Sequence, residues 1–227
     1  YIHNVVNTGN ITSTHQDPYV GALFCYQERG KVENFLNLGT ITGHKGGNMG
    51  RFQGTWTNVI DLSDTNMDGT DAGQNRGIRE DLTKADLTNG KVAYILGFKQ
   101  LIGIDKYPSP LNEAPVSYVG DAGYATFFDA DKGYELSGDV KAYVGIVKGD
   151  YLSLTKIACI AAGTPVVLKG TYYNKIVGDV LAENIANSLK GAAADTEAAG
   201  KYVLAKPEGN EVGFYLADKG TIAAGKA

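Results

Sequence analysis

The sequence predicts a mainly β protein: a short β-solenoid of about two to three coils with a small helical cap, followed by an antiparallel β-sandwich domain. A motif recurs near the N-terminus, the composition includes 30 Gly and 14 Tyr, and strand-like runs follow one another in the C-terminal half. Glycine-rich turns and tyrosine are typical of β proteins. The expected regions are solenoid repeats at 1–60, a loop, helical cap and proline-containing connector at 61–117, and the sandwich at 118–227.

The N-terminal motif is NVVNTGNIT at residues 4–12, and it returns as NFLNLGTIT at residues 34–42. An incomplete third copy, NVI, occupies residues 58–60. A period of about 20–50 residues is the mark of solenoids, in which each repeat packs only on its neighbours. The competing interpretation is an ordinary β-sandwich in which the similarity is a coincidence.

Stacked coils place equivalent residues about 4.8 Å apart along the axis. We therefore expect two structural ladders of hydrogen-bonded side-chain amides. Their members are Asn4, Asn34 and Asn58 in the first ladder, and Asn7 and Asn37 in the second. Gly9 and Gly39 are expected to adopt positive φ in the turn that follows. One interior position is expected to hold Val6, Leu36 and Ile60.

Residues 1–60 carry the pattern N-x-x-N-x-G-x-I-T followed by Y-V-G-A-L-x-x-Y. This pattern resembles the GLUG-type repeats of large secreted and surface proteins of gut Bacteroides-like bacteria. Those repeats have a Cys-Tyr pair at the positions that Val5-Val6 and Phe35-Leu36 occupy here. The resemblance implies a repeat architecture and a place at the bacterial surface, and it says little about activity.

The segment 61–77, DLSDTNMDGTDAGQNRG, is polar and turn-forming throughout. Within it, Asp64, Asn66 and Asp68 place oxygen ligands at alternate positions, as in the opening of a calcium loop. The bidentate Glu that ends such a loop is absent, so Asp71 is the substitute ligand that Ca²⁺ would need. The segment is therefore either a weak calcium loop or a solvated turn rich in Asp and Asn.

Residues 82–97, LTKADLTNGKVAYILG, have a helical pattern. Thr83 can cap the first turn and Asp86 follows three residues later, as in a capping box. The Asn-Gly pair at 89–90 divides the segment into two short helices. Residues 101–111 are then expected to run extended into the proline-containing connector.

The same block resembles the helix that follows the last repeat in those surface proteins. That helix reads Thr-x-x-(Asp/Glu)-Leu-x-x-Gly-x-Val-Ala-Tyr-x-Leu, and an Ile-Gly-x-Asp-x-Tyr-Pro string follows it. Residues 83–96 and 102–108 match both patterns. The resemblance implies that the block closes the end of the repeats.

From residue 118 onward, strand-like runs alternate with turns at spacings of about 8–12 residues, as in an antiparallel sandwich. The sequence IAAG at 160–163 leads into the apolar run VVLK, and IAAG recurs at 222–225. By this internal similarity, one more strand is expected after Ala227. We expect its position to be filled by another molecule, or left as an exposed edge that supports self-association. The strings GYATF, VKAY and YVLA resemble a C-terminal β module of the same surface proteins.

Composition and motifs argue against several functions. The formal net charge of −4 provides no basic surface for nucleic acid, and no apolar run approaches the roughly 20 residues that span a membrane. The sequence contains no G-x-S-x-G, H-E-x-x-H, P-loop or C-x-x-C motif. His15 and His44 fall in equivalent loops but lack a metal-ligand pattern. Cys25 and Cys159 lie in apolar runs and are interpreted as buried hydrophobes.

These observations predict that the chain is not an enzyme and has no cofactor, the Ca²⁺ interpretation aside. The predicted function is a non-catalytic extracellular or cell-surface structural or adhesion module, at the outer-membrane surface of a bacterium or outside it. Its partners would be other surface proteins or glycans. The alternative is a carbohydrate-binding accessory region of a larger secreted enzyme, in which Trp56 and Tyr173 stack on sugar rings.

Overall fold

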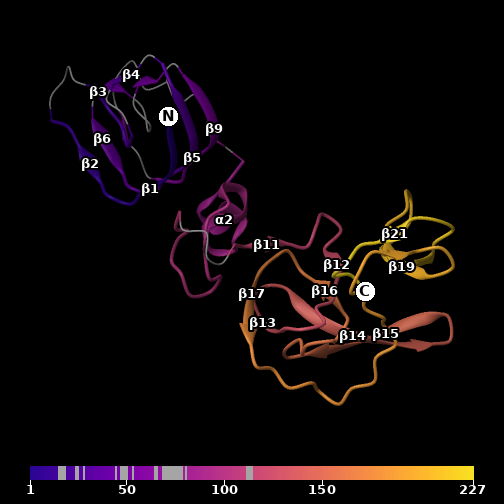
Figure 1. The fold of residues 1–227 in the computed structure, drawn as a ribbon. Helices are drawn as coiled ribbons and strands as arrows, with labels where there is room; N and C mark the ends of the chain where they lie inside the picture. The colour runs from indigo at the N-terminus through magenta and orange to yellow at the C-terminus, as the bar shows by residue number, and fades with distance from the viewer. Residues whose placement is uncertain are drawn as a thin grey trace. The chain divides into compact units, whose positions relative to one another are not determined.

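The chain folds into a mainly β structure with two short helices among its described residues (Figure 1). The computed structural model describes residues 1–14, 19–23, 26–27, 29–43, 45–46, 51–52, 54–63, 66–67, 79, 81–110 and 115–227. These residues form two compact units. The first unit comprises residues 1–100 and 104–116, and the second comprises residues 101–103 and 117–227.

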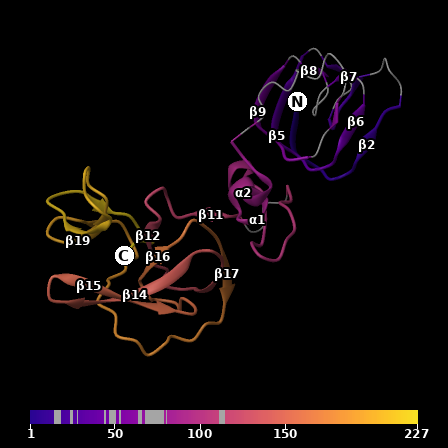
Figure 2. The ribbon, with the colours of Figure 1, turned by 180° about the vertical axis from the view of Figure 1, so that it is seen from behind.

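Short parallel strands build the first unit. They are β1 (Ile2–Asn7), β2 (Ile11–Thr12), β3 (Tyr19–Val20), β4 (Tyr26–Gln27), β5 (Lys31–Asn37), β6 (Ile41–Gly43), β7 (Lys45–Gly46), β8 (Arg51–Phe52), β9 (Thr55–Asp61) and β10 (Asn66–Met67). The sheets have the orders β1-β5-β9, β2-β6-β10, β3-β7 and β4-β8, and every pairing is parallel. Figures 1 and 2 both show β5 and β9 on one side of this unit and β6 and β2 on the other.

The register of these strands follows the sequence repeat. Val6 pairs with Leu36, and Leu36 pairs with Ile60, so the three residues expected to share one interior position do lie in one row. Leu36 and Ile60 are 0% exposed. This row packs against the helical segment that follows it, and the neighbouring Phe35 and Val59 are also buried, so both faces of these strands carry apolar side chains.

Two short helices follow, α1 (Lys84–Thr88) and α2 (Lys91–Leu96). The expected capping interaction is present, because the backbone N–H of Thr83 donates to Asp86 Oδ2 at 2.8 Å. Gly90 has φ 92°, a conformation that separates the two helices as the Asn-Gly pair predicts. Val92 and Leu96 are buried in one cluster with residues of β5 and β9, so the helices pack against the last strands of the first unit.

The expectation of an extended run over 101–111 is wrong. Residues 102–104 form a turn in which Gly103 has φ 86°, a left-handed conformation that glycine adopts easily. The backbones of Lys99 and Ser109 then exchange two hydrogen bonds of 2.9 Å. The segment therefore folds back on itself before it reaches Pro110.

The strands of the second unit pair antiparallel. They are β11 (Ser117–Tyr118), β12 (Tyr124–Phe127), β13 (Gly133–Gly138), β14 (Lys141–Lys148), β15 (Tyr151–Ile157), β16 (Val166–Lys169), β17 (Tyr172–Gly178), β18 (Thr196–Glu197), β19 (Tyr202–Ala205), β20 (Gly213–Leu216) and β21 (Thr221–Ile222). The sheet orders are β11-β17-β13, β12-β16-β14-β15, β18-β21 and β19-β20.

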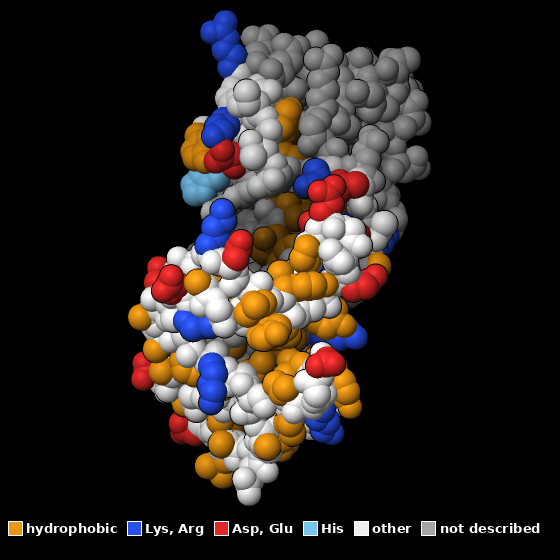
Figure 3. All heavy atoms as spheres, turned by 90° about the vertical axis from the view of Figure 1, so that its right-hand side faces the viewer, with side chains coloured by type: hydrophobic (Ala, Val, Ile, Leu, Met, Phe, Trp, Pro, Cys, Tyr) orange, Lys and Arg blue, Asp and Glu red, His pale blue; other side chains and the backbone are white. Residues whose placement is uncertain are grey.

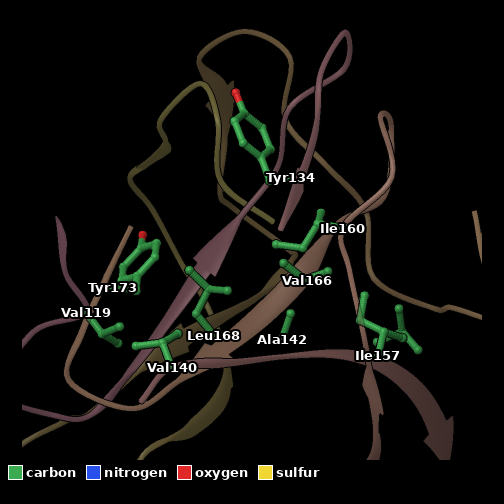
Figure 4. Packing of buried hydrophobic residues seen from close by; sticks show 10 residues of the cluster. Val119, Tyr134, Val140, Ala142, Ile157, Ile160, Val166, Leu168 and Tyr173 are labelled. Carbon is green, nitrogen blue, oxygen red and sulfur yellow. The ribbon is translucent and has the colours of Figure 1, made fainter. Parts of the chain in front are cut away.

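One apolar cluster of the second unit draws residues from both of its larger sheets. Val166 and Leu168 from the four-stranded sheet, and Val140 directly before β14, are at most 1% exposed. They cluster with Tyr134 and Tyr173 from the three-stranded sheet. Figure 4 shows the side chains of this cluster on the strands and turns that carry them. Ala142 and Val144 of β14, and Val166 and Leu168 of β16, are alternate residues that join this cluster, as expected for strands that turn one face to a core.

Candidate functional site

A row of asparagine side chains connects the three long parallel strands of the first unit. Asn58 Nδ2 donates to Asn34 Oδ1 at 2.9 Å, and Asn34 Nδ2 donates to Asn4 Oδ1 at 3.0 Å. The three residues are those expected to form the first ladder. The bonded residues are 30 positions apart between the first two strands and 24 apart between the next two, so side-chain alignment is kept although the connecting segments differ in length.

The same three asparagines have an uncommon backbone conformation. Their φ angles are 56°, 52° and 50° at Asn4, Asn34 and Asn58. Asparagine tolerates this left-handed region better than other residues with a Cβ, because its short polar side chain can hydrogen-bond nearby. Each strand carries this conformation at the same place, which directs the three amides along a common line.

A second row lies three residues further along each strand. Asn7 Nδ2 donates to Asn37 Oδ1 at 2.7 Å, and Asn37 Nδ2 donates to Asp61 Oδ1 at 3.2 Å. Asn37 is 0% exposed. Sequence reasoning named Asn7 and Asn37 but missed Asp61. The spacing contained the signal, because Asp61 follows Asn58 by the same three residues that separate Asn34 from Asn37.

The expectation that Gly9 and Gly39 supply positive φ is wrong, since neither is among the residues with positive φ. Residue 39 is glycine because there is no room for a side chain. A Cβ there would lie 2.1 Å from the carbonyl oxygen of Gly9 and 2.6 Å from its carbonyl carbon. The backbones of adjacent repeats thus approach so closely at this turn that no side chain fits.

The last strand of the parallel stack is covered by the segment that follows it. Asn58 Nδ2 lies 3.4 Å from the carbonyl oxygen of Ile95 in α2, and the Arg79 N–H donates to the Val59 carbonyl at 3.0 Å. Arg79 also forms two hydrogen bonds to Asp81, of 2.7 and 2.6 Å. The Arg79 guanidinium lowers the pKa of Asp81 to about 2. Two polar groups of β9, the Asn58 amide and the Val59 carbonyl, therefore have partners in the segment that follows the strand.

The calcium and histidine interpretations fall mostly outside the described residues. Asp64, Asp68 and Asp71 lie there, as do His15, His44 and Cys25. The backbone of Asn66 belongs to β10 and pairs with Thr42. In the part of the chain that the structure describes, no three His, Cys, Asp or Glu side chains lie close enough to hold a metal ion.

The two aromatic residues of the carbohydrate interpretation lie in different units. Trp56 is half-buried and packs against the cluster of Val32, Phe35 and Val59. The expectation that Tyr173 offers a stacking surface is wrong, because it is 7% exposed and belongs to the core of the second unit. Burial raises the pKa of the Tyr173 hydroxyl, and a hydrogen bond with Ser117 opposes that rise.

The face drawn in Figure 3 shows hydrophobic side chains in patches, with charged side chains of both signs scattered among them. Such a surface provides no single-sign field to attract a polyanion.

No helix among the described residues has the length and apolar character needed to cross a membrane. Comparisons with family models, curated proteins and solved structures find no match to this chain.

Proposed function

We propose that this chain is a non-catalytic structural or adhesion module at the outer surface of a bacterium. In this proposal the first unit is a short β-solenoid that acts as a stalk or spacer, the helices form its cap, and the second unit is a β-sandwich. The observation that carries the proposal is the aligned pair of side-chain rows across three parallel strands. Repeats stacked in this way extend a protein in one direction while each contacts only its neighbours.

The chemistry of the aligned rows also favours a structural role. Side-chain amides donate and accept hydrogen bonds but do not titrate near neutral pH. Their partners along the rows are other side chains of the same rows, so they hold adjacent strands together. The resemblance to surface-protein repeats agrees with a spacer outside the cell.

The architectural part of the proposal can be tested by adding a repeat. A second copy of residues 31–54 inserted after Gly54 should give a folded protein, because the new strand has the same neighbours above and below. We expect the urea midpoint, followed by the fluorescence of the single Trp, to stay equal or rise. Loss of the folded transition would refute modular stacking, since a closed core cannot accept an extra strand.

The capping part has a matched test within α2. Val92 is 0% exposed and Tyr94 is 45% exposed. Val92→Asp should displace the helices from β9 and expose an edge that pairs with other chains. We expect concentration-dependent oligomers for Val92→Asp by light scattering and none for Tyr94→Asp. A monomeric, folded Val92→Asp variant would show that the helices are not a cap.

The location and the carbohydrate alternative need separate measurements. Trypsin treatment of intact producing cells should release peptides of this protein before any cytosolic marker, and release only after lysis would refute a surface location. A glycan array should show no saturable binding if the protein is a spacer. Binding that Trp56→Ala abolishes, while a variant of an exposed residue such as Thr57→Ala retains it, would instead support the carbohydrate-binding function.

A further inference from the structure

Strand β15 has one paired edge and one free edge. It is an outer strand of the four-stranded sheet in the second unit, and its 7 residues pair with β14 in one unbroken antiparallel register. On its other side, no strand of residues 115–227 pairs with it. The hairpin of β14 and β15 reaches the margin of the second unit in Figures 1 and 2. The last residue of the sequence lies at the other outer strand, β12, where the Ala227 N–H donates to Thr126 Oγ1 at 3.1 Å.

The hydrogen bonds of β14 show which residues of β15 face the free edge. The Gly145 carbonyl points away from β15, because it accepts the N–H of Ser188 at 2.6 Å. Gly145 pairs with Leu154, and two paired residues of an antiparallel ladder either bond each other or both face away. The backbone groups of Leu154 therefore point to the free edge. Those of Leu152 and Lys156 do so as well, because orientation repeats every second residue.

Polar groups next to the free edge are satisfied, whereas those of the free edge are not. The Ala158 N–H, which is next in the same series, donates to Glu183 Oε1 at 2.8 Å. Among residues 115–227, no backbone hydrogen bond engages the outward groups of Leu152, Leu154 or Lys156. Edge strands are usually protected by a proline, a bulge or several charges. This strand is regular and contains no proline and a single charged residue, so its edge can serve as a template for another strand.

Apolar side chains border the free edge, and one charge lies near each of its ends. Val147 of β14 and Tyr151 of β15 are 61% and 66% exposed, and Leu154 is 39% exposed. Asp150 directly precedes the strand, Lys156 lies near its other end, and both are exposed. An apolar edge with opposite charges at its two ends is complementary to an identical edge that runs in the opposite direction.

We propose that the free edge of β15 binds the same edge of a second copy of this chain, so that two second units share one continuous antiparallel sheet. A two-fold axis at Ser153 pairs Leu152 with Leu154 of the partner subunit, and Asp150 with Lys156 of the partner subunit. The symmetry repeats each pair in the reverse sense. The outward backbone groups of the two leucines then exchange about four hydrogen bonds across the axis.

The charges select this register over the neighbouring one. An axis at Leu154 would bring Asp150 next to Ala158 of the partner subunit, whose N–H is bound by Glu183, and the two carboxylates would repel each other. With the axis at Ser153, each carboxylate of Asp150 instead faces an ammonium group. Because one strand of each copy forms the contact, its area is small and the dimer is reversible. This inference goes beyond the role proposed for the first unit and does not depend on it.

Cysteine cross-linking of the full chain tests the register. Ser153→Cys places two thiols at a non-hydrogen-bonded pair with Cα atoms about 4.5 Å apart, within the disulfide range of about 4.4–6.8 Å. Thr155→Cys is the matched control on the same strand, because its two copies would lie about 13 Å apart along the strand direction. In a glutathione buffer we expect at least about tenfold more disulfide-linked dimer for Ser153→Cys, with the 153–153 link identified by peptide mapping. Equal linkage in the two variants would overturn the proposal.

Sedimentation equilibrium measures the association without a cross-link. We expect a dimer with a Kd between about 10 μM and 1 mM. Leu154→Lys should weaken it at least about tenfold, because a charged residue at an edge opposes strand pairing. Val177→Lys, which also replaces an exposed apolar residue but lies in the other sheet, should leave the Kd unchanged, and circular dichroism should show that both variants are folded. A chain that stays monomeric at about 1 mM, or an equal effect of the two variants, would overturn the proposal.

A charge exchange tests the pairing of Asp150 with Lys156. Asp150→Lys and Lys156→Asp should each weaken the dimer, because each places like charges opposite each other across the axis. The double variant should restore the affinity, since opposite charges then face each other again. A double variant that binds no more tightly than the single variants would refute the register centred on Ser153.

Discussion

Substitution of Asn34 tests both the hydrogen bonds and the backbone conformation of the first asparagine row. Asn34→Ala removes two amide hydrogen bonds, of 3.0 and 2.9 Å, each worth about 0.5–1.5 kcal/mol. It also places alanine at φ 52°, which costs a residue with a Cβ about 1–2 kcal/mol. The expected loss in the free energy of unfolding is therefore about 2–5 kcal/mol.

Asn34→Gly separates the two contributions, because glycine loses the hydrogen bonds but tolerates the left-handed conformation. We expect it to be less destabilising than Asn34→Ala by about 1 kcal/mol. Urea unfolding followed by the fluorescence of Trp56 reports on the first unit, because Trp56 is the single Trp and lies in β9. Thr57→Ala, at an exposed neighbouring position, is the control. The reasoning is refuted if Asn34→Ala unfolds like Thr57→Ala, or if Asn34→Gly is the less stable of the two variants.

Three further predictions concern other parts of the chain. Gly39→Ala should destabilise the first unit by about 1–3 kcal/mol, whereas Gly9→Ala, whose Cβ would have its nearest neighbour at 3.7 Å, should be tolerated; equal urea midpoints would contradict the close approach. The hydrogen bond to Asp129 raises the pKa of Tyr134 to about 12, so its stabilisation is present below the ordinary tyrosine pKa of about 10 and is lost as pH rises toward 12. The free energy of unfolding of the second unit, measured in urea by circular dichroism, should therefore decrease less over this pH interval in Tyr134→Phe than in the unmodified protein. Identical pH profiles would refute the assignment. Asp86→Ala should lower the free energy of unfolding, followed by Trp56 fluorescence, by about 1 kcal/mol, because it removes the carboxylate that accepts the Thr83 N–H. An unchanged urea midpoint would show that this capping interaction does not stabilise the helices.

Sequence patterns predicted the features that depend on nearby residues better than those that depend on distant contacts. The mainly β class, the two helices and the Thr83–Asp86 interaction are encoded by residues close together in the chain, so short-range propensities suffice. The spacing of Asn34 and Asn37 also indicated which side chains meet. The roles of Gly39 and Tyr173 were missed because they depend on distant contacts. Close approach to Gly9 and burial among the strands of the second unit are tertiary properties that no local window contains.

The two side-chain rows of the first unit have opposite hydrogen-bond polarity. From Asn58 the first row donates toward the N-terminal strand, whereas the second donates from Asn7 toward Asp61. A carboxylate can only accept, so Asp61 fixes the direction of its own row. Chains of amides polarise one another when they align head to tail, and two such chains in opposite senses cancel much of each other's dipole. Further repeats could then be added without a growing electric field along the stack, so this chemistry sets no electrostatic limit on its length.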